Sequence, residues 1–223
     1  MVKIPPFSFS SLSKFETCPR QYYLTRVAKL VREPPTVHTT WGNDVHKAIE
    51  ERVKNKKPLP GQMEKWEQLV APFDIVKGVV SVEQKLSLTR NLTPTGWFDP
   101  SAWCRAIIDL SVDAGKKSLL LDWKTGKVKS DVDQLRLSTA IWLKTKPYVE
   151  KVYAIYMWLA HGKATPVEFT RDDAAEIIVD FTVRSRRLEE SYERDRWLPK
   201  PSGLCNGWCP VGKQHCEFWS PKK

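Results

Sequence analysis

Charged side chains stand at the ends of two apolar segments in the middle of the chain. Asp109 follows Ala-Ile-Ile, and Asp122 and Lys124 follow the leucines of LLLDWKTGK, residues 119–127. Residues two apart on a strand share a face, so we expect Asp122 and Lys124 to point the same way. A hairpin would bring Asp109 and Asp122, which are 13 positions apart (122 − 109 = 13), to one end of a sheet.

Two carboxylates at such short range repel each other unless a cation lies between them. Hard oxygen ligands favour Mg²⁺ or Mn²⁺, and the Lys124 ammonium would then face an attacking water or a developing phosphate charge. The plainer interpretation is that strand-end acids are turn residues and that Asp-x-Lys is a solvated ion pair of almost no energetic value. Taken alone, DWKTG favours this plainer interpretation.

Two further residues favour the interpretation as a metal-binding catalytic site. His46 lies in GNDVHKAIEE, where a neutral imidazole can complete a metal site, although a lone helical histidine is more often structural or solvated. Gln134 lies 10 positions after Lys124 (134 − 124 = 10), on the helix expected after DWKTGK. It could position a phosphate or a water, and its plainer role is that of a glutamine on a helix surface.

The elements that must position these residues alternate between helical and strand patterns. Helices are expected over 8–27 (broken near Pro19), 39–57, 63–76, 131–146 and 170–197, and strands over 78–89, 103–113, 118–126 and 151–162. Thr170 followed by Asp173 resembles a capping box at the start of the last helix. The order predicts an α/β domain with one central mixed sheet flanked by helices.

Charge and composition indicate a class of partner. The chain has 223 residues, 36 basic against 26 acidic, and a net charge of +10, which favours a polyanion such as DNA; the alternative is a protein that merely happens to be basic. Exposed members of its ten tryptophans would suit base stacking. No apolar run approaches the roughly 20 residues of a membrane span, and the N-terminus has no secretory pattern, so a cytoplasmic location is expected.

The segments GNDVH, AIID, DWKTG and DQLRLSTAIW together resemble the RecB-like branch of the PD-(D/E)XK nuclease superfamily. The resemblance implies a restriction-endonuclease-like core. It also implies metal binding by His46, Asp109, Asp122 and the backbone carbonyl of Trp123, with Lys124 as a catalytic residue beside the two aspartates.

The same resemblance implies roles for two more residues and shows one departure. Glu83, in SVEQKL, is similar to a strand glutamate that supports the site in many members, and Gln134 matches the helical glutamine. In many relatives a tyrosine follows that glutamine by four residues, whereas this chain has Ser138. We expect a nearby aromatic residue, Trp142, to take over the substrate contact.

Four of the five cysteines resemble those of the iron–sulfur subgroup, which includes AddB nuclease domains and the CRISPR-associated four-cysteine exonucleases. These are Cys18, Cys205, Cys209 and Cys216. The resemblance implies a [4Fe–4S] cluster that holds the tail against the first helix. The last gaps are one residue longer than expected for the subgroup, so structural Zn²⁺ is the alternative, held by the four cysteines or by three of them with His215, and reduced free thiols are a third. Cys104, on a strand, is expected to be a small core residue.

Together these patterns predict a single nuclease domain over residues 1–223. It comprises an N-terminal helical region (1–76), a nuclease core (77–198) and a cysteine-rich tail (199–223) that completes the cluster with Cys18. The expected function is a metal-dependent DNA exonuclease on single strands or DNA ends, in recombination, repair or phage and CRISPR DNA processing, with a helicase or recombinase as partner. The alternatives are a non-catalytic DNA-binding or recombination scaffold and an RNA nuclease, since both nucleic acids present the same phosphate.

Overall fold

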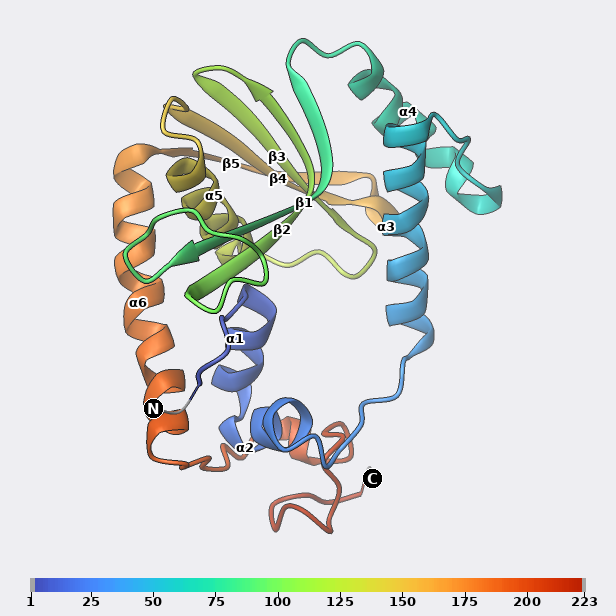
Figure 1. The fold of residues 1–223 in the computed structure, drawn as a ribbon. Helices are drawn as coiled ribbons and strands as arrows, with labels where there is room; N and C mark the ends of the chain where they lie inside the picture. Colours follow the sequence, from blue (N-terminus) through green and yellow to red (C-terminus); the bar gives the residue numbers. More distant parts are fainter. Residues whose placement is uncertain (1–2, 222–223) are drawn as a thin grey trace. The chain divides into compact units, whose positions relative to one another are not determined.

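The computed structural model describes residues 3–221, which group into two compact units (Figure 1). Unit 1 comprises Met1–Pro35 and Asp180–Lys223, and unit 2 comprises Thr36–Val179. The first 35 residues therefore group with the C-terminal part of the chain, a division that differs from the boundaries at 76 and 198 expected from composition. Unit 2 contains the sheet, and unit 1 contains the cysteine-rich tail.

The helices and strands follow in a fixed order along the chain. The α-helices are α1 (Phe9–Thr17), α2 (Pro19–Tyr22), α3 (Val37–Asn55), α4 (Glu67–Val70), α5 (Asp133–Thr145) and α6 (Arg171–Glu193). The strands are β1 (Val79–Thr89), β2 (Ala102–Ala114), β3 (Lys117–Lys124), β4 (Lys151–Trp158) and β5 (Lys163–Thr170). Short 3₁₀ segments are Gly61–Trp66, Ala71–Asp74, Leu159–His161 and Gly203–Cys205, and Tyr23–Val27 is a π-helix.

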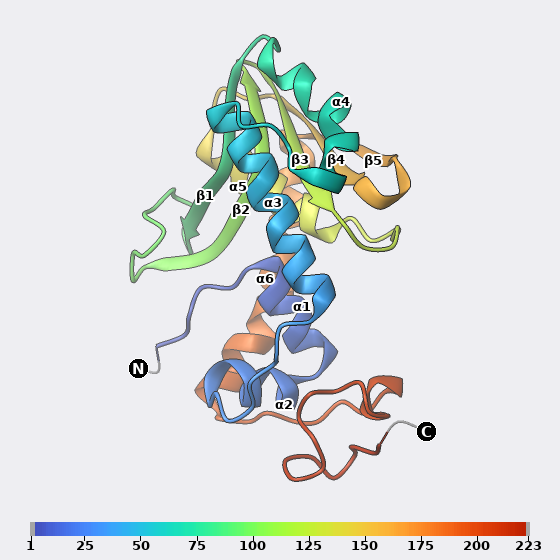
Figure 2. The same ribbon diagram turned by 90° about the vertical axis from the view of Figure 1, so that its right-hand side faces the viewer.

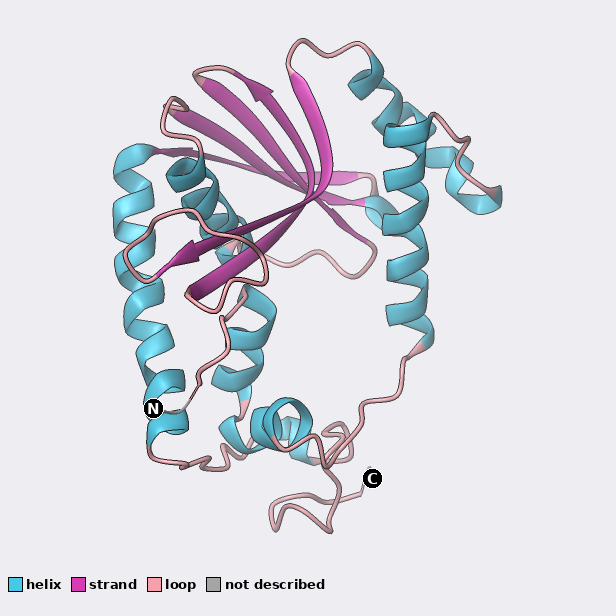
Figure 3. Cartoon of the chain, viewed as in Figure 1, coloured by secondary structure: helices cyan, strands magenta, loops and turns pink. Residues whose placement is uncertain are grey.

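The five strands form one mixed sheet in the order β1-β2-β3-β4-β5 (Figure 3). Strands β3 and β4 are parallel because α5 carries the chain back between them, whereas the other neighbouring pairs are antiparallel hairpins. The prediction of a mixed central sheet flanked by helices is confirmed, and the hairpin expected between the segments of Asp109 and Asp122 is the β2–β3 pair.

Two parts of unit 2 differ from the sequence-based expectation. Strand β5 was not expected, since KATPVEFT contains Pro166 and most of its residues are not buried. It is an edge strand, where proline is tolerated because one side of the strand needs no ladder hydrogen bonds. The helix expected over 63–76 is instead α4 between two 3₁₀ segments, and Pro72 lies at the start of the second.

Helix α3 packs on the sheet through a stripe of apolar residues with helical spacing. Val45, Ile49 and Val53 join a buried cluster that includes Leu121 and Trp123 of β3. Helix α5 contacts β1, β2 and β4 and lies on the opposite face from α3 (Figures 1 and 2). Strand β3 therefore turns Trp123 toward the α3 cluster and the neighbouring Asp122 toward α5, as the alternation of side chains along a strand requires.

Unit 1 is held together by an aromatic cluster and charged pairs. The cluster consists of Phe15, Tyr22, Tyr23, Tyr192 and Trp197. Arg184 of α6 forms a two-point ion pair with Glu16 of α1, with both N–O distances at 2.7 Å. Bidentate geometry of this kind fixes the relative orientation of two helices better than a single contact does. As expected, the N-terminal helix is interrupted at Pro19, where α1 gives way to α2.

Among residues 3–221, no helix combines the length and the apolar character that crossing a membrane requires.

Candidate active site

The β2–β3 ladder stops at the two aspartates. Its last pair is Leu110 with Leu121, so Asp109 and Asp122 are the next residues on each strand, where β2 diverges from β3. Because the strands diverge, the backbone of Trp123 forms no ladder pair with β2. Its N–H donates to Asp109 Oδ2 at 2.8 Å, and its carbonyl lies 2.9 Å from His46 Nε2. The end of the ladder thus creates a gap lined by carboxylate and carbonyl oxygens.

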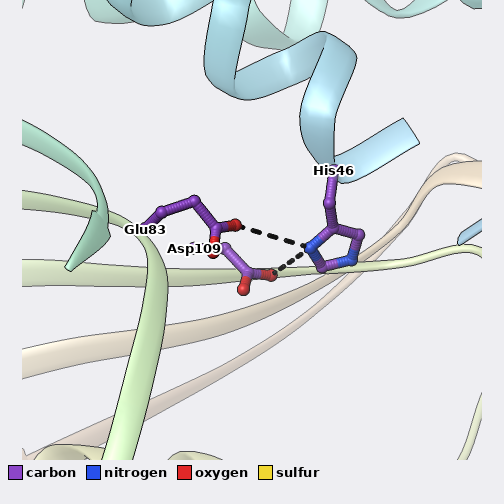
Figure 4. A group of neighbouring side chains, drawn as sticks. All are labelled: His46, Glu83 and Asp109. Atoms are coloured by element: carbon purple, nitrogen blue, oxygen red, sulfur yellow. Dashed lines mark ion pairs between the residues drawn. The ribbon is translucent and has the colours of Figure 1, made fainter. Parts of the chain in front are cut away.

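Three side chains from three elements converge on this gap (Figure 4). His46 comes from α3, and its Nδ1 lies 3.4 Å from Asp109 Oδ2 and 3.9 Å from Glu83 Oε1. One potential ligand atom from each of these residues lies within 4.8 Å of the others, which suits a single metal ion. The structure therefore places Glu83 in the cluster with His46 and Asp109.

Glu83 lies between two regular pairs of β1 and β2, with its backbone in a left-handed conformation. The β1–β2 pairing runs from Val82 opposite Leu110 to Gln84 opposite Ile108, and Glu83 has a φ of 49°. A left-handed backbone is uncommon for residues other than glycine and is strained where it occurs. This conformation is the local feature that distinguishes Glu83 from the regular strand residues around it.

A second group lies next to the first, on the α5 side of β3. Lys124 Nζ is 2.6 Å from Asp122 Oδ1 and donates to Gln134 Oε1 at 2.9 Å. Gln134 Nε2 in turn donates to Asp122 Oδ2 at 2.5 Å. These three side chains form a closed polar network, and the Lys124 ammonium also lies 4.9 Å from the centre of the Tyr156 ring.

The pKa values of Asp122 and His46 are strongly perturbed by burial and by the neighbouring charges. Burial, followed by the charge of Asp109, raises the pKa of Asp122 to about 7, although Lys124 and His46 oppose the shift. Burial lowers the pKa of His46, but hydrogen bonds with Asp109 and Glu83 and the charges of both aspartates outweigh burial and raise it to about 10. The excess negative charge of the gap is therefore compensated by a protonated imidazole.

These residues fit a divalent cation. Asp122 Oδ1 is buried and accepts no hydrogen bond of normal geometry, although Lys124 Nζ lies close to it. An unsatisfied buried carboxylate oxygen is costly and is satisfied by a cation. The donor set of carboxylates, one imidazole and one backbone carbonyl suits Mg²⁺ or Mn²⁺.

The structure brings the sequence-predicted site residues together in unit 2, in the two neighbouring groups just described. Trp142 does not join them: it is 1% exposed, so the expectation that it contacts substrate in place of a tyrosine is wrong. Sequence reasoning also missed Tyr156, which lies on β4 opposite Asp122. Only the parallel pairing of β3 with β4 reveals this neighbour, because the two residues are 34 positions apart (156 − 122 = 34).

The four cysteines line one pocket of unit 1, and none is in a disulfide. Backbone N–H groups of Lys200 and Ser202 approach Cys18 Sγ and Cys205 Sγ at 3.4 and 3.5 Å. Within residues 3–221, no three cysteine sulfurs all lie within 4.8 Å of one another. His215 does not line this pocket, and Cys104 is a buried strand residue, as expected.

Comparison with known proteins gives one partial family match and a similar fold. Residues 6–99 match the family model of the PD-(D/E)XK nuclease superfamily, and this match ends before Asp109. The crystal structure of the "Putative exonuclease" from Eubacterium rectale has a similar fold at 12% identity and a TM-score of 0.55, and the alignment covers 91% of this chain and 86% of that one. The structure of SSO0001 aligns at 16% identity over 95% and 96% of the two chains with a TM-score of 0.37.

No curated protein matches this sequence. Residues 6–99 are therefore similar to the PD-(D/E)XK nuclease superfamily, and the sheet has a fold similar to that of the Eubacterium rectale protein.

Proposed function

We propose that the chain is a metal-dependent nuclease that hydrolyses phosphodiester bonds of DNA. The observation that carries this proposal is the meeting of His46, Glu83 and Asp109 with the Asp122–Lys124–Gln134 network where β2 and β3 diverge. A cluster of acids that includes Asp122, whose pKa is strongly raised, beside a lysine is more typical of a reactive site than of a structural ion pair. The net charge of +10 suits a polyanionic substrate.

Each residue has a role that follows from its position. Glu83, Asp109 and Asp122, with the Trp123 carbonyl and a deprotonated His46, would hold the cation. A divalent cation in such a site lowers the pKa of a bound water and stabilises charge on the phosphate. Lys124 would orient the attacking water or offset the developing negative charge, while Gln134 holds both Asp122 and Lys124 in position.

Cleavage of end-labelled linear DNA with Mg²⁺ or Mn²⁺ tests the proposal. Wild type should degrade the DNA, whereas Asp122→Asn and Lys124→Gln should lower the rate by at least about a hundredfold, the scale of losing one electrostatic group at a reacting centre. Asp172→Asn is the matched control, because this acid is exposed and lies outside the site. Metal-independent binding of DNA without cleavage would instead favour a non-catalytic scaffold, and preferential cleavage of RNA would favour an RNA nuclease.

Within this function we propose exonucleolytic action on single strands or DNA ends, in recombination, repair or related DNA processing with a helicase or recombinase as partner. The resemblance in DWKTG and GNDVH supports this finer assignment. Cleavage of linear and of covalently closed DNA of the same sequence distinguishes exonuclease from endonuclease action. An exonuclease should leave the closed circle intact, and cutting of both forms at equal rates would show endonuclease action.

We further propose a [4Fe–4S] cluster at Cys18, Cys205, Cys209 and Cys216. Their shared pocket and the backbone N–H groups that approach two sulfurs support it, since such hydrogen bonds accompany cluster thiolates. Around one zinc ion with Zn–S bonds of ~2.3 Å, tetrahedral geometry places sulfurs only ~3.8 Å apart. A four-iron cluster binds each thiolate to its own iron and therefore suits a wider separation of sulfurs.

Anaerobic purification with iron, sulfide and zinc analysis tests the cluster. A brown protein with roughly four irons per chain is expected. Stoichiometric zinc in a colourless anaerobic preparation would contradict the iron assignment.

A further inference from the structure

The β1–β2 hairpin carries a surface of alternating basic and aromatic side chains outside the candidate active site. We call it the hairpin surface. It consists of Lys85, Arg90, Trp97, Phe98, Trp103 and Arg105. The loop that joins the two strands contributes Trp97 and Phe98 and projects from the sheet in Figure 2.

Cations and rings on this surface are in direct contact. Lys85 Nζ lies 5.9 Å and the Arg105 guanidinium 5.1 Å from the centre of the Trp97 ring. The Arg90 guanidinium lies 5.7 Å from the Trp103 ring. Hydrogen bonds from the Ser87 hydroxyl to the carbonyls of residues 95 and 96, at 2.7 and 3.0 Å, hold the loop over the strands. The surface is thus ordered before any ligand arrives.

The hairpin surface also has unused binding capacity. Phe98 is 86% exposed, although burial would stabilise so large an apolar side chain. Within residues 3–221, Lys85 and Arg105 have no ion pair with a carboxylate, and Arg105 Nε is buried without a hydrogen-bond acceptor. Packing of cations on the rings accounts for the position of Trp97 but not for the exposure of the Phe98 ring.

The hairpin surface adjoins the candidate active site along the same two strands. Lys85 is two residues from Glu83 on β1, and Arg105 is four residues from Asp109 on β2. At ~3.4 Å per strand residue, these separations are about 7 and 14 Å. A polynucleotide whose phosphate occupies the site therefore has its next few nucleotides within reach of the hairpin surface.

We propose that the hairpin surface binds the single-stranded stretch of the DNA substrate next to the scissile phosphate. Bases stack on Phe98 and the exposed edges of the tryptophans, and phosphates pair with Lys85, Arg90 and Arg105. Interleaved rings and cations are typical of single-strand binding, since stacked bases are accessible only when unpaired. The inference rests on the proposed nuclease function for its choice of substrate.

Binding measured without cleavage tests the inference separately from catalysis. Fluorescence anisotropy in EDTA would follow labelled oligo(dT) of about 20 nucleotides, which exceeds the ~4–16 nucleotides of a typical single-strand site. Phe98→Ala should weaken binding by about fivefold or more, equivalent to losing about 1 kcal/mol of stacking. Ile75→Ala is the matched control in unit 2, because Ile75 is 87% exposed, and should bind like wild type.

Separate variants distinguish the contributions of charge and of base stacking to DNA binding. Lys85→Gln should reduce the salt dependence of binding by about 0.7 in log K against log[salt], the value for one phosphate contact on a single strand. The exposed Lys77→Gln is its control and should leave the slope unchanged. Phe98→Ala should leave duplex binding within about twofold of wild type, because paired bases offer no free face.

Three outcomes would overturn the inference: equal binding by Phe98→Ala and Ile75→Ala, equal losses on single strands and duplex, or tighter binding of oligo(rU) than of oligo(dT). A wild-type protein that cuts no DNA, combined with the predicted binding loss, would refute the nuclease function while leaving the hairpin surface as a single-strand site. A wild-type protein that cuts DNA, with no effect of Phe98→Ala, would refute only the surface.

Discussion

Asp122→Asn should stabilise the metal-free protein while abolishing its activity. Asp122 is 7% exposed, and burial, followed by the nearby Asp109 charge, raises its pKa from 3.8 to about 7. The folded state therefore binds a proton more tightly than the unfolded state does. The unfavourable contribution of Asp122 is absent below the unfolded pKa, grows between about pH 4 and pH 7, and is constant above that range.

The size of the stabilisation follows from the shift in the pKa of Asp122. A rise of about 3 units, at ~1.4 kcal/mol per unit, gives an upper bound of about 4 kcal/mol for ionising Asp122 in the folded protein. Asparagine removes this contribution but leaves Lys124 without its anionic partner, so we expect a net gain of about 2 kcal/mol. At ~2–4 °C per kcal/mol for a chain of this size, Tm should rise by about 4–8 °C.

Thermal unfolding in EDTA, monitored by circular dichroism, measures this stabilisation by Asp122→Asn. The gain should be present at about pH 8 and should shrink by more than half at about pH 5, where folded Asp122 is mostly protonated. Adding Mn²⁺ should raise the Tm of wild type, through preferential binding to the folded state, and should raise that of the variant much less. The exposed Asp172→Asn should behave like wild type. A variant that is less stable than wild type in EDTA at both pH values would refute the reasoning.

Three further predictions concern other parts of the chain. Ile49→Ala should lower the free energy of unfolding by about 2–4 kcal/mol, measured by urea denaturation, because Ile49 is 1% exposed and packs α3 on the sheet; an unchanged midpoint would contradict this packing. Cys18→Ala should abolish iron binding in anaerobic protein, whereas Cys104→Ala should retain it; equal iron contents would exclude the cluster ligand set. Calorimetric titration of Mn²⁺ in two buffers at about pH 8.5, where Asp122 is already ionised, should show release of about one proton, because the pKa of His46 is about 10 before the ion binds; no dependence on the buffer would exclude His46 as a ligand.

The sequence predicts the local part of the site well. Asp122 and Lys124 share a face because they are two apart on a strand, and the short turn after β2 forces antiparallel pairing with Asp109. Gln134 follows from the helix that must carry the chain from β3 to its parallel neighbour. These inferences need only the period of a strand and a short connection.

The features that sequence reasoning missed depend on long-range pairing. Tyr156 meets Lys124 only because β4 adds to the sheet in register with β3. Glu83 was expected to support the site, but no local pattern in SVEQKL indicates its left-handed backbone within β1. Strand β5 is an edge strand in which only Phe169 is buried, so the alternation of its side chains is a weak signal in the sequence.

Mn²⁺ binding and DNA cleavage by Lys124→Met, measured on the same preparation, test the central claim most directly. Lys124 lies beside the proposed metal site and is not one of its proposed ligands, so the variant should bind Mn²⁺ within about tenfold of wild type but cut linear DNA at least about a hundredfold more slowly. Cleavage at the wild-type rate would contradict the assignment of this site as the catalytic centre of a nuclease.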